Sequence, residues 1–368
     1  MKLLPALLLG TALIGVSGFA YGLGHEDRPN IVIIYSDDQG YGDFSLQNPD
    51  SKIPTPHLDE LARQGARFTD AHSSSGMCTP SRYALLTGRY HWRQGEGIVG
   101  SWGGPWWDEG RLTLGQMLQE KGYRTACIGK WHLGWDWSAI RNEQVADRNS
   151  PEAWDWSKPV PGGPLDHGFA ENTLVIFSSD NGPENIAYER IRNHGHYSMG
   201  PLRGLKRDVR EGGRRVPFAI RWPGVIESGT VSESLIGQID IMATIASIVG
   251  YKLPDTAAED SYDLLPYLLG EAETPGRDTL VHRTWGEPWG IRHRDWVYIN
   301  ASTGALQNEP DWLGHEATPH DAVLNRLDDD LGQQQNLVEA RPNKAAELEA
   351  MLEEIRARGY SAPRLMND

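Results

Sequence analysis

Apolar and polar positions follow a regular succession in the first half of the chain. Residues Asn30–Ser36 and Asn172–Ser179 are near-continuous apolar runs rich in β-branched side chains, as in strands buried on both faces of a parallel sheet. The sequence between them predicts three helices and a further strand: Pro56–Gly65 closed by its glycine, Ser81–Thr87 entered through Pro80, Leu112–Lys121, and the strand Arg124–Gly129. Strands and helices in this order predict a parallel sheet with helical crossovers.

The second half of the chain contains shorter elements. They are a strand at Val216–Arg221, helices at Gln238–Val249 and Tyr262–Leu269, alternating stretches such as Trp289–Ile299 that suit an antiparallel sheet, and an amphipathic helix at Ala345–Arg358. We therefore expect a large α/β domain at residues 27–272. A smaller C-terminal α+β subdomain, with a small antiparallel sheet and a helix, is expected at residues 273–368.

The N-terminal residues predict a secretory signal peptide. A basic start at Met1-Lys2 leads into the apolar run Leu3–Val16 and then into small residues that end at Ala20. The apolar run is too short to span a bilayer comfortably, and no cysteine follows it to accept a lipid. We expect removal of residues 1–20, export to the periplasm or the medium, and no membrane span in the mature form.

Composition limits the partners that the chain can bind. The formal net charge is −15, and basic residues are nowhere densely clustered, which argues against a nucleic-acid partner. An anionic substrate would need a local reversal of charge, supplied by a metal ion or by converging Lys and Arg. Many of the 14 tryptophans lie between Trp92 and Trp156, which suits either packing or a sugar-stacking surface.

The chain has two cysteines, in different surroundings. Cys78 follows a Ser- and Gly-rich loop and precedes a predicted helix, whereas Cys127 lies in the predicted strand Arg124–Gly129. An oxidising compartment allows the two to form a disulfide. A buried, unreactive thiol is the ordinary expectation for Cys127 in an apolar strand.

Two pairs of oxygen-bearing side chains follow the two strongest predicted strands. Asp37-Asp38 and Asp180-Asn181 stand at carboxyl ends of strands, where open α/β sheets place their ligands. Such residues also form simple turns after strands. Two pairs at equivalent strand ends favour a metal site, and hard oxygen donors suit Ca²⁺ or Mg²⁺ rather than zinc.

The run Cys78-Thr79-Pro80-Ser81-Arg82, followed by Leu85-Leu86-Thr87-Gly88-Arg89, resembles the signature of the formylglycine-dependent sulfatases. In that family a maturation enzyme oxidises the cysteine to formylglycine, an aldehyde that hydrates to a geminal diol. Most of the mature chain shares the resemblance, through Asn30–Asp43, Gly129–Gly134, Phe177–Gly182, Pro201–Lys206 and Glu211–Pro217. The resemblance implies an alkaline-phosphatase-like, mostly parallel sheet flanked by helices.

The same resemblance implies a sulfuric ester hydrolase that acts on sulfated carbohydrates or aryl sulfates. Calcium would be held by Asp37, Asp38, Asp180, Asn181 and an oxygen of the modified residue 78, with magnesium as the less favoured ion. Arg82, Lys130 and Lys206 would neutralise the sulfate. Asp38 would take a proton from the attacking hydroxyl, Lys206 would protonate the departing alcohol, and His132 would deprotonate the remaining hydroxyl. Without the resemblance, the two lysines would be interpreted as surface residues and His132 as a loop histidine.

One segment departs from the family pattern. Asp166-His167-Gly168-Phe169 runs directly into Ala170–Ile176, whereas related sulfatases carry a long stretch at this point, with a sheet strand that bears a sulfate-contacting histidine and then a helix. We therefore expect a strand and its crossover helix to be missing near Phe169-Ala170. His167, His194 and His196 are the nearest candidates to replace the lost histidine.

Two alternatives to a sulfatase remain open from the sequence. One is a phosphonate or phosphate ester hydrolase of the same fold, and the other is an inactive homologue that only binds calcium and anions. The tryptophans expected near the site are Trp102, Trp106, Trp107, Trp135 and Trp137. His282, Trp285 and Trp289 of the smaller subdomain suit either core packing or an outer substrate subsite.

Overall fold

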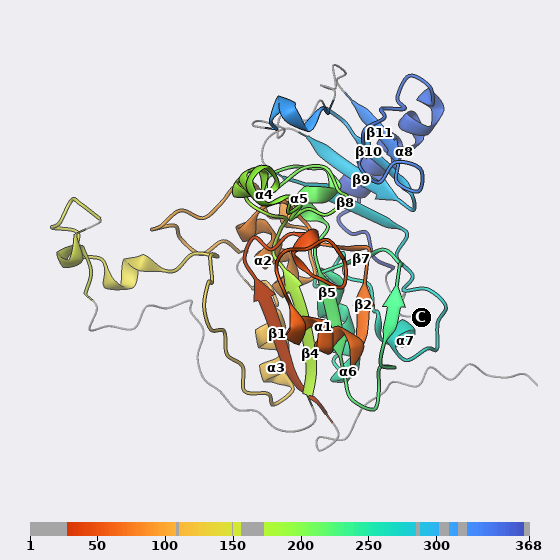
Figure 1. Cartoon of the computed structure of the whole chain (residues 1–368). Coiled ribbons are helices and arrows are strands. Elements are labelled where there is room, and N and C mark those ends of the chain that lie inside the picture. The colour runs from red at the N-terminus through yellow and green to blue at the C-terminus, as the bar shows by residue number, and fades with distance from the viewer. Residues whose placement is uncertain are drawn as a thin grey trace, which may run out of the picture.

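The computed structural model describes residues 28–107, 110–148, 150–155, 173–284, 288–301, 309–315 and 322–363. The expected signal peptide, the Phe169-Ala170 junction, His167 and Trp285 lie outside these ranges. Within them, a five-stranded sheet forms the lower part of the molecule and a four-stranded sheet the upper part (Figure 1).

The larger sheet has the strand order β1-β4-β5-β2-β6. Its strands are β1 (Asn30–Ser36), β4 (Thr173–Ser179), β5 (Phe218–Arg221), β2 (Ala66–Phe68) and β6 (Thr230–Ser232). β1 pairs with β4 and β2 with β6 in parallel, while β5 is antiparallel to both of its neighbours. Four strands therefore run in one direction and β5 in the other, which confirms the predicted mostly parallel sheet.

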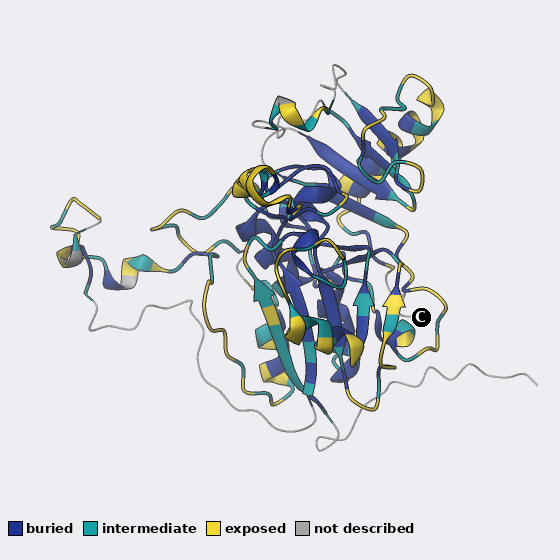
Figure 2. Cartoon of the chain, in the orientation of Figure 1, coloured by how far each residue is buried: buried dark blue, intermediate teal, exposed yellow. Residues whose placement is uncertain are grey.

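Helices cover both faces of this sheet, because alternate side chains of its strands point to opposite sides. On one face, Leu174 and Ile176 of β4 belong to a core shared with α3 (Leu114–Glu120), α6 (Asp240–Ile248) and α7 (Leu265–Leu268). On the other face, Phe177 packs in a cluster with residues of α1 (Pro56–Arg63). Figure 2 shows how this burial is concentrated in the sheet and the layers against it.

The predicted helices are present, but their ends differ from prediction by one to three residues, and two of these differences affect the surrounding structure. α2 spans Cys78–Thr87, so it begins three residues before the predicted start and places Cys78 in its first turn. α1 ends with Gln64 as its C-cap, not with the predicted Gly65. Gly65 is needed for another reason, since a Cβ there would lie 2.0 Å from the carbonyl oxygen of Ile220.

The C-terminal region forms the expected smaller subdomain. Its antiparallel sheet has the order β11-β10-β9-β8, built from β8 (Thr279–Arg283), β9 (Trp289–His293), β10 (Trp296–Ile299) and β11 (Val323–Arg326). α8 (Pro342–Ala357) packs on it through buried side chains that include Leu348 and Leu352. The exact boundary between residues 272 and 273 stays a prediction.

Further short elements connect the two regions. They are the parallel pair β3 (Ala71–His72) and β7 (Ile236–Gly237), the helices α4 (Ile186–His194) and α5 (Glu211–Arg214), and the 3₁₀ turns η1 (Tyr41–Asp43), η2 (His91–Arg93), η3 (Trp137–Ile140), η4 (Pro151–Ala153) and η6 (Asp311–Leu313). The segment that carries η3 and η4 projects away from the central sheet (Figure 1). None of the helices in the described ranges is both long and apolar enough to cross a bilayer.

The predicted strand Arg124–Gly129 is wrong. These residues form no strand, and Ile128 is 79% exposed. The segment is tethered to both ends of β1, because the Tyr123 hydroxyl donates to the carbonyl of Pro29 at 2.9 Å and Lys130 Nζ contacts Asp37 at 2.6 Å. Among the described residues, β1 pairs only with β4, and its other edge is open. No described strand lies between β1 and residues 124–129, so this segment has no strand to pair with. An open edge at β1 fits the predicted absence of one strand.

The cysteines also differ from expectation. Both are free thiols, and Cys127 is exposed rather than buried. The reason is the same as for the missing strand, since a segment without a pairing partner has nothing to cover its side chains. The possible disulfide between Cys78 and Cys127 is not formed.

Candidate active site

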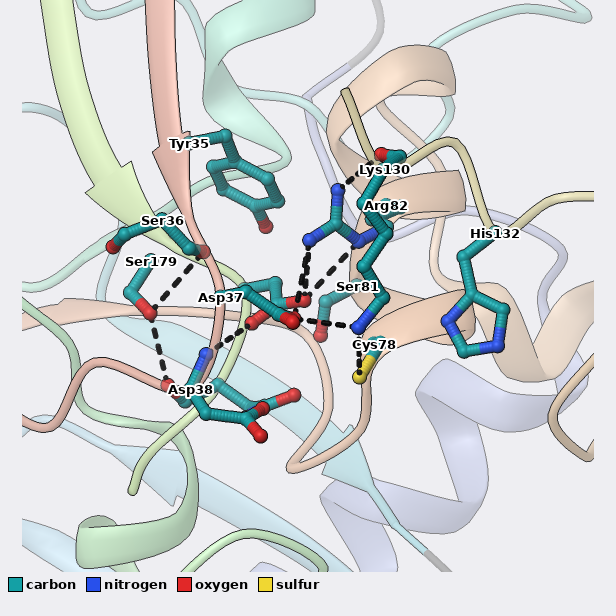
Figure 3. A network of polar contacts seen from close by, with 12 residues as sticks. Tyr35, Ser36, Asp37, Asp38, Cys78, Ser81, Arg82, Lys130, His132 and Ser179 are labelled. Atoms are coloured by element: carbon teal, nitrogen blue, oxygen red, sulfur yellow. Dashed lines mark hydrogen bonds and ion pairs between the residues drawn. The ribbon is translucent and has the colours of Figure 1, made fainter. Parts of the chain in front are cut away.

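Two pairs of polar side chains meet where β1 and β4 end. The parallel pairing is in register to the last residue of each strand, so Asp37 and Asp38 lie beside Asp180 and Asn181. Ligand atoms of Asp37, Asp38, Asp180 and Cys78 all lie within 4.8 Å of one another. Figure 3 shows Asp37, Asp38 and Cys78 of this grouping, with Cys78 approaching from the start of α2.

Side-chain contacts fix the orientation of the two acidic pairs. Asp38 has a left-handed backbone with φ of 56°, and its amide donates to Asp180 Oδ1 at 3.1 Å. Asn181 Nδ2 donates to Asp38 Oδ1 at 2.8 Å. Asn181 Oδ1, by contrast, is buried and accepts no hydrogen bond from the described residues. A buried oxygen without a partner is costly, and a cation beside it would remove that cost.

Each of the three carboxylates contacts a cationic side chain. Arg82 donates to Asp180 Oδ2 through Nε at 3.1 Å and Nη2 at 2.8 Å. Lys130 Nζ lies 2.6 Å from Asp37 Oδ1 and 3.4 Å from the sulfur of Cys78. Lys206 Nζ contacts both carboxylate oxygens of Asp38 at 2.6 Å. The structure therefore brings all three predicted cations to the site.

The acidic groups differ strongly in proton affinity. Burial raises the pKa of Asp180 to about 6, although the nearby Arg82 opposes this shift. Burial also acts to raise the pKa of Asp37, but hydrogen bonds from Lys130 and to Asp180 outweigh it and hold the pKa at about 2. Burial, followed by the negative charge of Asp180, raises the pKa of the Cys78 thiol. An unmodified Cys78 is therefore a protonated, poor nucleophile at neutral pH.

His132 stands beside this group in a strained loop. Its backbone has φ of 58°, and its carbonyl accepts a hydrogen bond from Thr79 Oγ1 at 2.8 Å. Its Nε2 lies 3.0 Å from the carbonyl oxygen of Val99, which assigns the proton to Nε2. Nδ1 is buried and has no partner among the described residues. Burial, assisted by the charge of Lys130, lowers the pKa of His132, so the ring is neutral with a free lone pair.

The histidines considered as replacements lie elsewhere or outside the described residues. His194 is exposed at the end of α4. His196 is buried, with Nε2 2.7 Å from Asp43 Oδ1 and Nδ1 accepting from the amide of Lys52 at 3.1 Å. Asp43 in turn accepts from the amide of Gly40 at 3.0 Å, so this histidine supports the loop that follows Asp38.

Sequence reasoning missed one acidic residue of the site. Glu184 Oε1 lies 3.3 Å from Lys206 Nζ and 2.7 Å from Arg207 Nη2. Arg207 has a φ of 76°, and its amide donates to the carbonyl of Gly76 at 2.6 Å. Glu184 therefore helps to place Lys206 relative to Asp38. Its position three residues after Asn181 was the only available signal, and many loop glutamates follow strands in this way.

A second acidic group lies between the two sheets and joins them. Asp70, His72 and Glu211 are buried and close enough to hold a metal ion. Arginines occupy the space between them instead: Arg292 contacts Asp70 at 2.7 Å and Glu211 at 3.2 Å, and Arg215 contacts both at 3.3 and 3.5 Å. Cations already neutralise this cluster, which makes it a buried ion-pair network. The family-like stretch Glu211–Pro217 supplies part of it.

The expected tryptophans divide into packing and surface positions. Trp102 packs against Trp137 and Trp154, Trp106 against Tyr83, and Trp107 against Trp131. Trp135 and Trp137 line a cavity of about 420 Å³ formed by the segments 99–103 and 132–137, and His132 is part of its wall. His282 and Trp289 are buried in the C-terminal subdomain, 1% and 8% exposed, where they contribute to packing.

Comparison with known proteins gives a consistent result. The sulfatase family model matches residues 29–166 and 164–251, more than half of the 368 residues. An N-acetylgalactosamine-6-O-sulfatase of Bacteroides thetaiotaomicron is 26% identical over 491 aligned positions, which cover 91% of this chain and 94% of that protein. Human arylsulfatase A is 29% identical over 378 positions, 72% of this chain and 73% of its own.

Structural comparison agrees at the level of the fold. A solved structure from work on glycosaminoglycan metabolism by Bacteroides thetaiotaomicron superposes with a TM-score of 0.72 at 24% identity, covering 90% of this chain and 100% of that one. The alignment with the N-acetylgalactosamine-6-O-sulfatase is longer than the 368 residues of this chain, so part of that relative has no counterpart here.

Proposed function

The chain belongs to the sulfatase family, whose members are sulfuric ester hydrolases, and from this premise we propose that it releases sulfate through a formylglycine made from Cys78 and a bound calcium ion. The observation that carries the proposal is the grouping of Asp37, Asp38, Asp180 and Cys78 within 4.8 Å. Carboxylates that can hold a divalent cation lie beside a cysteine that can be converted to formylglycine. Such a group can bind and cleave a sulfate ester although the protein has a net charge of −15.

The residues present fit a hard divalent cation. Asp37, Asp38, Asp180 and Asn181 offer oxygen donors only, as calcium prefers, and Asn181 Oδ1 is a buried acceptor without a partner among the described residues. When bound, the ion would polarise the oxygen of residue 78 and one sulfate oxygen. It would also neutralise carboxylates that now hold the cationic side chains.

Three cations are positioned to receive the sulfate once these carboxylates are neutralised. Lys130 already contacts the Cys78 sulfur at 3.4 Å, and Arg82 donates to the carbonyl of Lys130 at 2.7 Å. Lys206 is held from two sides by Asp38 and Glu184. We assign charge neutralisation to all three and protonation of the departing alcohol to Lys206. Asp38 is the proposed acceptor of the proton from the attacking hydroxyl.

His132 has the protonation state that a general base requires. Its ring is neutral because burial and Lys130 lower its pKa, and its Nδ1 lone pair is unoccupied in the described residues. Donation from Nε2 to Val99 fixes the tautomer. We propose that His132 accepts the proton of the second hydroxyl of residue 78, which expels sulfate and restores the aldehyde.

We propose sulfated carbohydrates or aryl sulfates as substrates. The N-acetylgalactosamine-6-O-sulfatase and arylsulfatase A relatives act on these two classes by name. The proposal includes export to the periplasm or medium, and a formylglycine-generating or equivalent enzyme as the maturation partner. Export follows from the N-terminal sequence, and the maturation partner follows from the Cys78 motif.

The test combines maturation with turnover. The full chain should be produced with and without a formylglycine-generating enzyme, and the mass of the Cys78 peptide compared with the rate of 4-nitrophenyl sulfate hydrolysis. We expect the aldehyde mass and calcium-dependent hydrolysis to occur together. Preference for 4-nitrophenyl phosphate over the sulfate would favour the phosphatase alternative.

One observation favours the inactive alternative, and the same experiment covers it. In the described residues one edge of β1 is open, which fits the expected loss of the strand that carries the sulfate-contacting histidine in related sulfatases. Complete conversion of Cys78 without hydrolysis of either ester, together with retained calcium binding, would support a binding protein instead of an enzyme.

A further inference from the structure

A cavity adjoins the cationic site and shares His132 with it. It measures about 420 Å³, within the range of small-molecule sites, and lies between the segments 99–103 and 132–137. Resting on the proposed function, we infer that this cavity binds the alcohol part of the substrate, and that its ligand is an uncharged pyranose ring stacked on Trp135. Three independent features of the cavity carry this inference.

The first feature is a rigid connection to Cys78. Thr79, the residue after Cys78, donates from Oγ1 to the carbonyl of His132 at 2.8 Å and accepts from the amide of Val99 at 3.2 Å. Both walls of the cavity are thereby fixed to the first turn of α2. A group bound in the cavity is consequently held at a defined position relative to residue 78.

The second feature is the contrast between the two tryptophans. Trp137 is fixed by Trp102 and Trp154, and its Nε1 donates to the carbonyl of Gly103 at 3.1 Å. Trp135 is half-buried and is anchored through its amide, which donates to the same carbonyl at 3.2 Å. Its indole N–H makes no hydrogen bond with any described residue. An accessible ring with a free donor suits a sugar, which offers an apolar C–H face and hydroxyl acceptors.

Close backbone packing keeps this platform in place. Gly134 has a φ of 79°, and a Cβ there would lie 1.8 Å from the carbonyl oxygen of Gly104. Only glycine therefore allows the segment before Trp135 to approach the facing loop so closely. The preorganised platform reduces the entropy that a ligand would lose on ordering it.

The third feature is the absence of charge. The described lining consists of glycines, one valine, Ser101, two tryptophans and His132, and the pKa of His132 is lowered by burial and by Lys130. The cations of the site are all on the Cys78 side. The two ends thus separate an anionic sulfate from a neutral ring, because a second acidic group on that ring would meet no cation among the described lining residues.

Ligand-observed NMR titration of the unconverted full chain tests the inference, because binding is then independent of turnover. The probes are methyl β-D-galactopyranoside and the matching galacturonide, which differ by one carboxylate. We expect the neutral galactoside to bind, the galacturonide to bind at least about tenfold more weakly, and Trp135→Ala to weaken galactoside binding about tenfold. Trp312→Ala is the matched control, since Trp312 is 49% exposed and does not line the cavity.

A charge-adding variant keeps the test valid even if Trp135→Ala disturbs the loop. Ser101 is an exposed lining residue, and Ser101→Lys should reverse the preference so that the galacturonide binds better. Equal binding of both probes, no binding of the galactoside, or unchanged preference in Ser101→Lys would overturn the inference. Hydrolysis of 4-nitrophenyl sulfate without galactoside binding refutes this subsite alone, whereas galactoside binding without hydrolysis refutes only the proposed function.

Discussion

At the scale of single residues, the site is a set of mutually neutralised charges. Asp37, Asp38 and Asp180 each hold a lysine or an arginine, so the cations that would bind a sulfate are engaged until another positive charge replaces them. Mutual pairing of this kind makes metal binding and anion binding cooperative. A divalent cation that takes the carboxylates releases the cations for the substrate.

The position of most of these groups was predictable from the sequence. Oxygen-bearing side chains that directly follow two buried strands had to meet once those strands paired, and the Cys78 motif located the helix start between them. The partner of Lys206 was not predictable. Glu184 reaches it because of a turn after β4 that no local pattern specifies, and the pairing of His196 with Asp43 depends on the same three-dimensional packing.

Replacement of Cys78 by serine should separate the two halves of the reaction. A serine has one hydroxyl, so it can accept sulfate but has no second hydroxyl to expel it. We expect a burst equal to the enzyme concentration and a steady-state rate at least about 10³-fold below that of the matured wild type. Stopped-flow absorbance with 4-nitrophenyl sulfate and the mass of the sulfated peptide measure both.

Cys127→Ser is the matched control for that experiment. Cys127 is an exposed, free thiol outside the site, so its loss should leave the burst and the steady state unchanged. Continuous turnover by Cys78→Ser would contradict the need for a second hydroxyl.

Calcium binding should depend on pH through Asp180. Burial raises the pKa of this carboxyl to about 6, so it is protonated below that pH and must lose its proton to bind a cation. Affinity should therefore be constant well above pH 6 and fall by about tenfold per pH unit below it. Asp37 does not change the calcium affinity in this pH range, because its pKa is about 2 and it stays ionised.

Isothermal titration of the unconverted chain with calcium chloride at pH 5, 6, 7 and 8 measures this dependence. Titrations in two buffers of different ionisation enthalpy report the released proton. Asp180→Asn should bind calcium weakly at every pH and release no proton near pH 6. An affinity that is equal at pH 5 and pH 8 in the wild type would rule out Asp180 as the titrating ligand.

At the scale of elements, the decisive feature is the open edge of β1. The sequence Asn30–Ser36 is apolar on both faces, as in a strand with two neighbours, yet its Ile34 is 47% exposed and it pairs only with β4 in the described residues. The segment Arg124–Gly129 was predicted as a strand but forms none, because no described strand lies beside it to pair with. An apolar run becomes a strand only if a partner lies beside it, and the local pattern carries no information about that partner.

This open edge should make the protein self-associate. An unpaired apolar strand edge is a template for pairing with other chains, and a charged side chain on it blocks such pairing. We expect concentration-dependent association of the wild type, and a marked reduction in Ile34→Lys, by sedimentation velocity. Ile53→Lys is the matched control, because Ile53 is 37% exposed but lies outside β1. Equal association of wild type and Ile34→Lys would locate the contact elsewhere.

At the scale of the whole molecule, the chain keeps the architecture of its family in fewer residues. The mostly parallel sheet, its helical layers and the C-terminal sheet were predictable from the sequence, and they survive around the position where relatives have additional residues. The strand order and the antiparallel direction of β5 were not. The contact between the two sheets was not predictable. It depends on Arg292 of β9, which meets Asp70 and Glu211 from segments more than 80 residues away in sequence.

That contact should determine the stability of the assembled protein. Arg292 is 7% exposed and donates to both oxygens of Asp70 at 2.7 Å, so Arg292→Met would leave two buried carboxylates with fewer cations. Breaking a buried pair on one side costs about 3–5 kcal/mol of unfolding free energy.

Arg294→Met is the control two residues away, since the Arg294 side chain is 72% exposed and its only ion pair is 4.0 Å long in the described residues. Urea denaturation should show a large loss for the first variant and almost none for the second. Equal midpoints would mean that apolar packing, and not these ions, joins the two sheets.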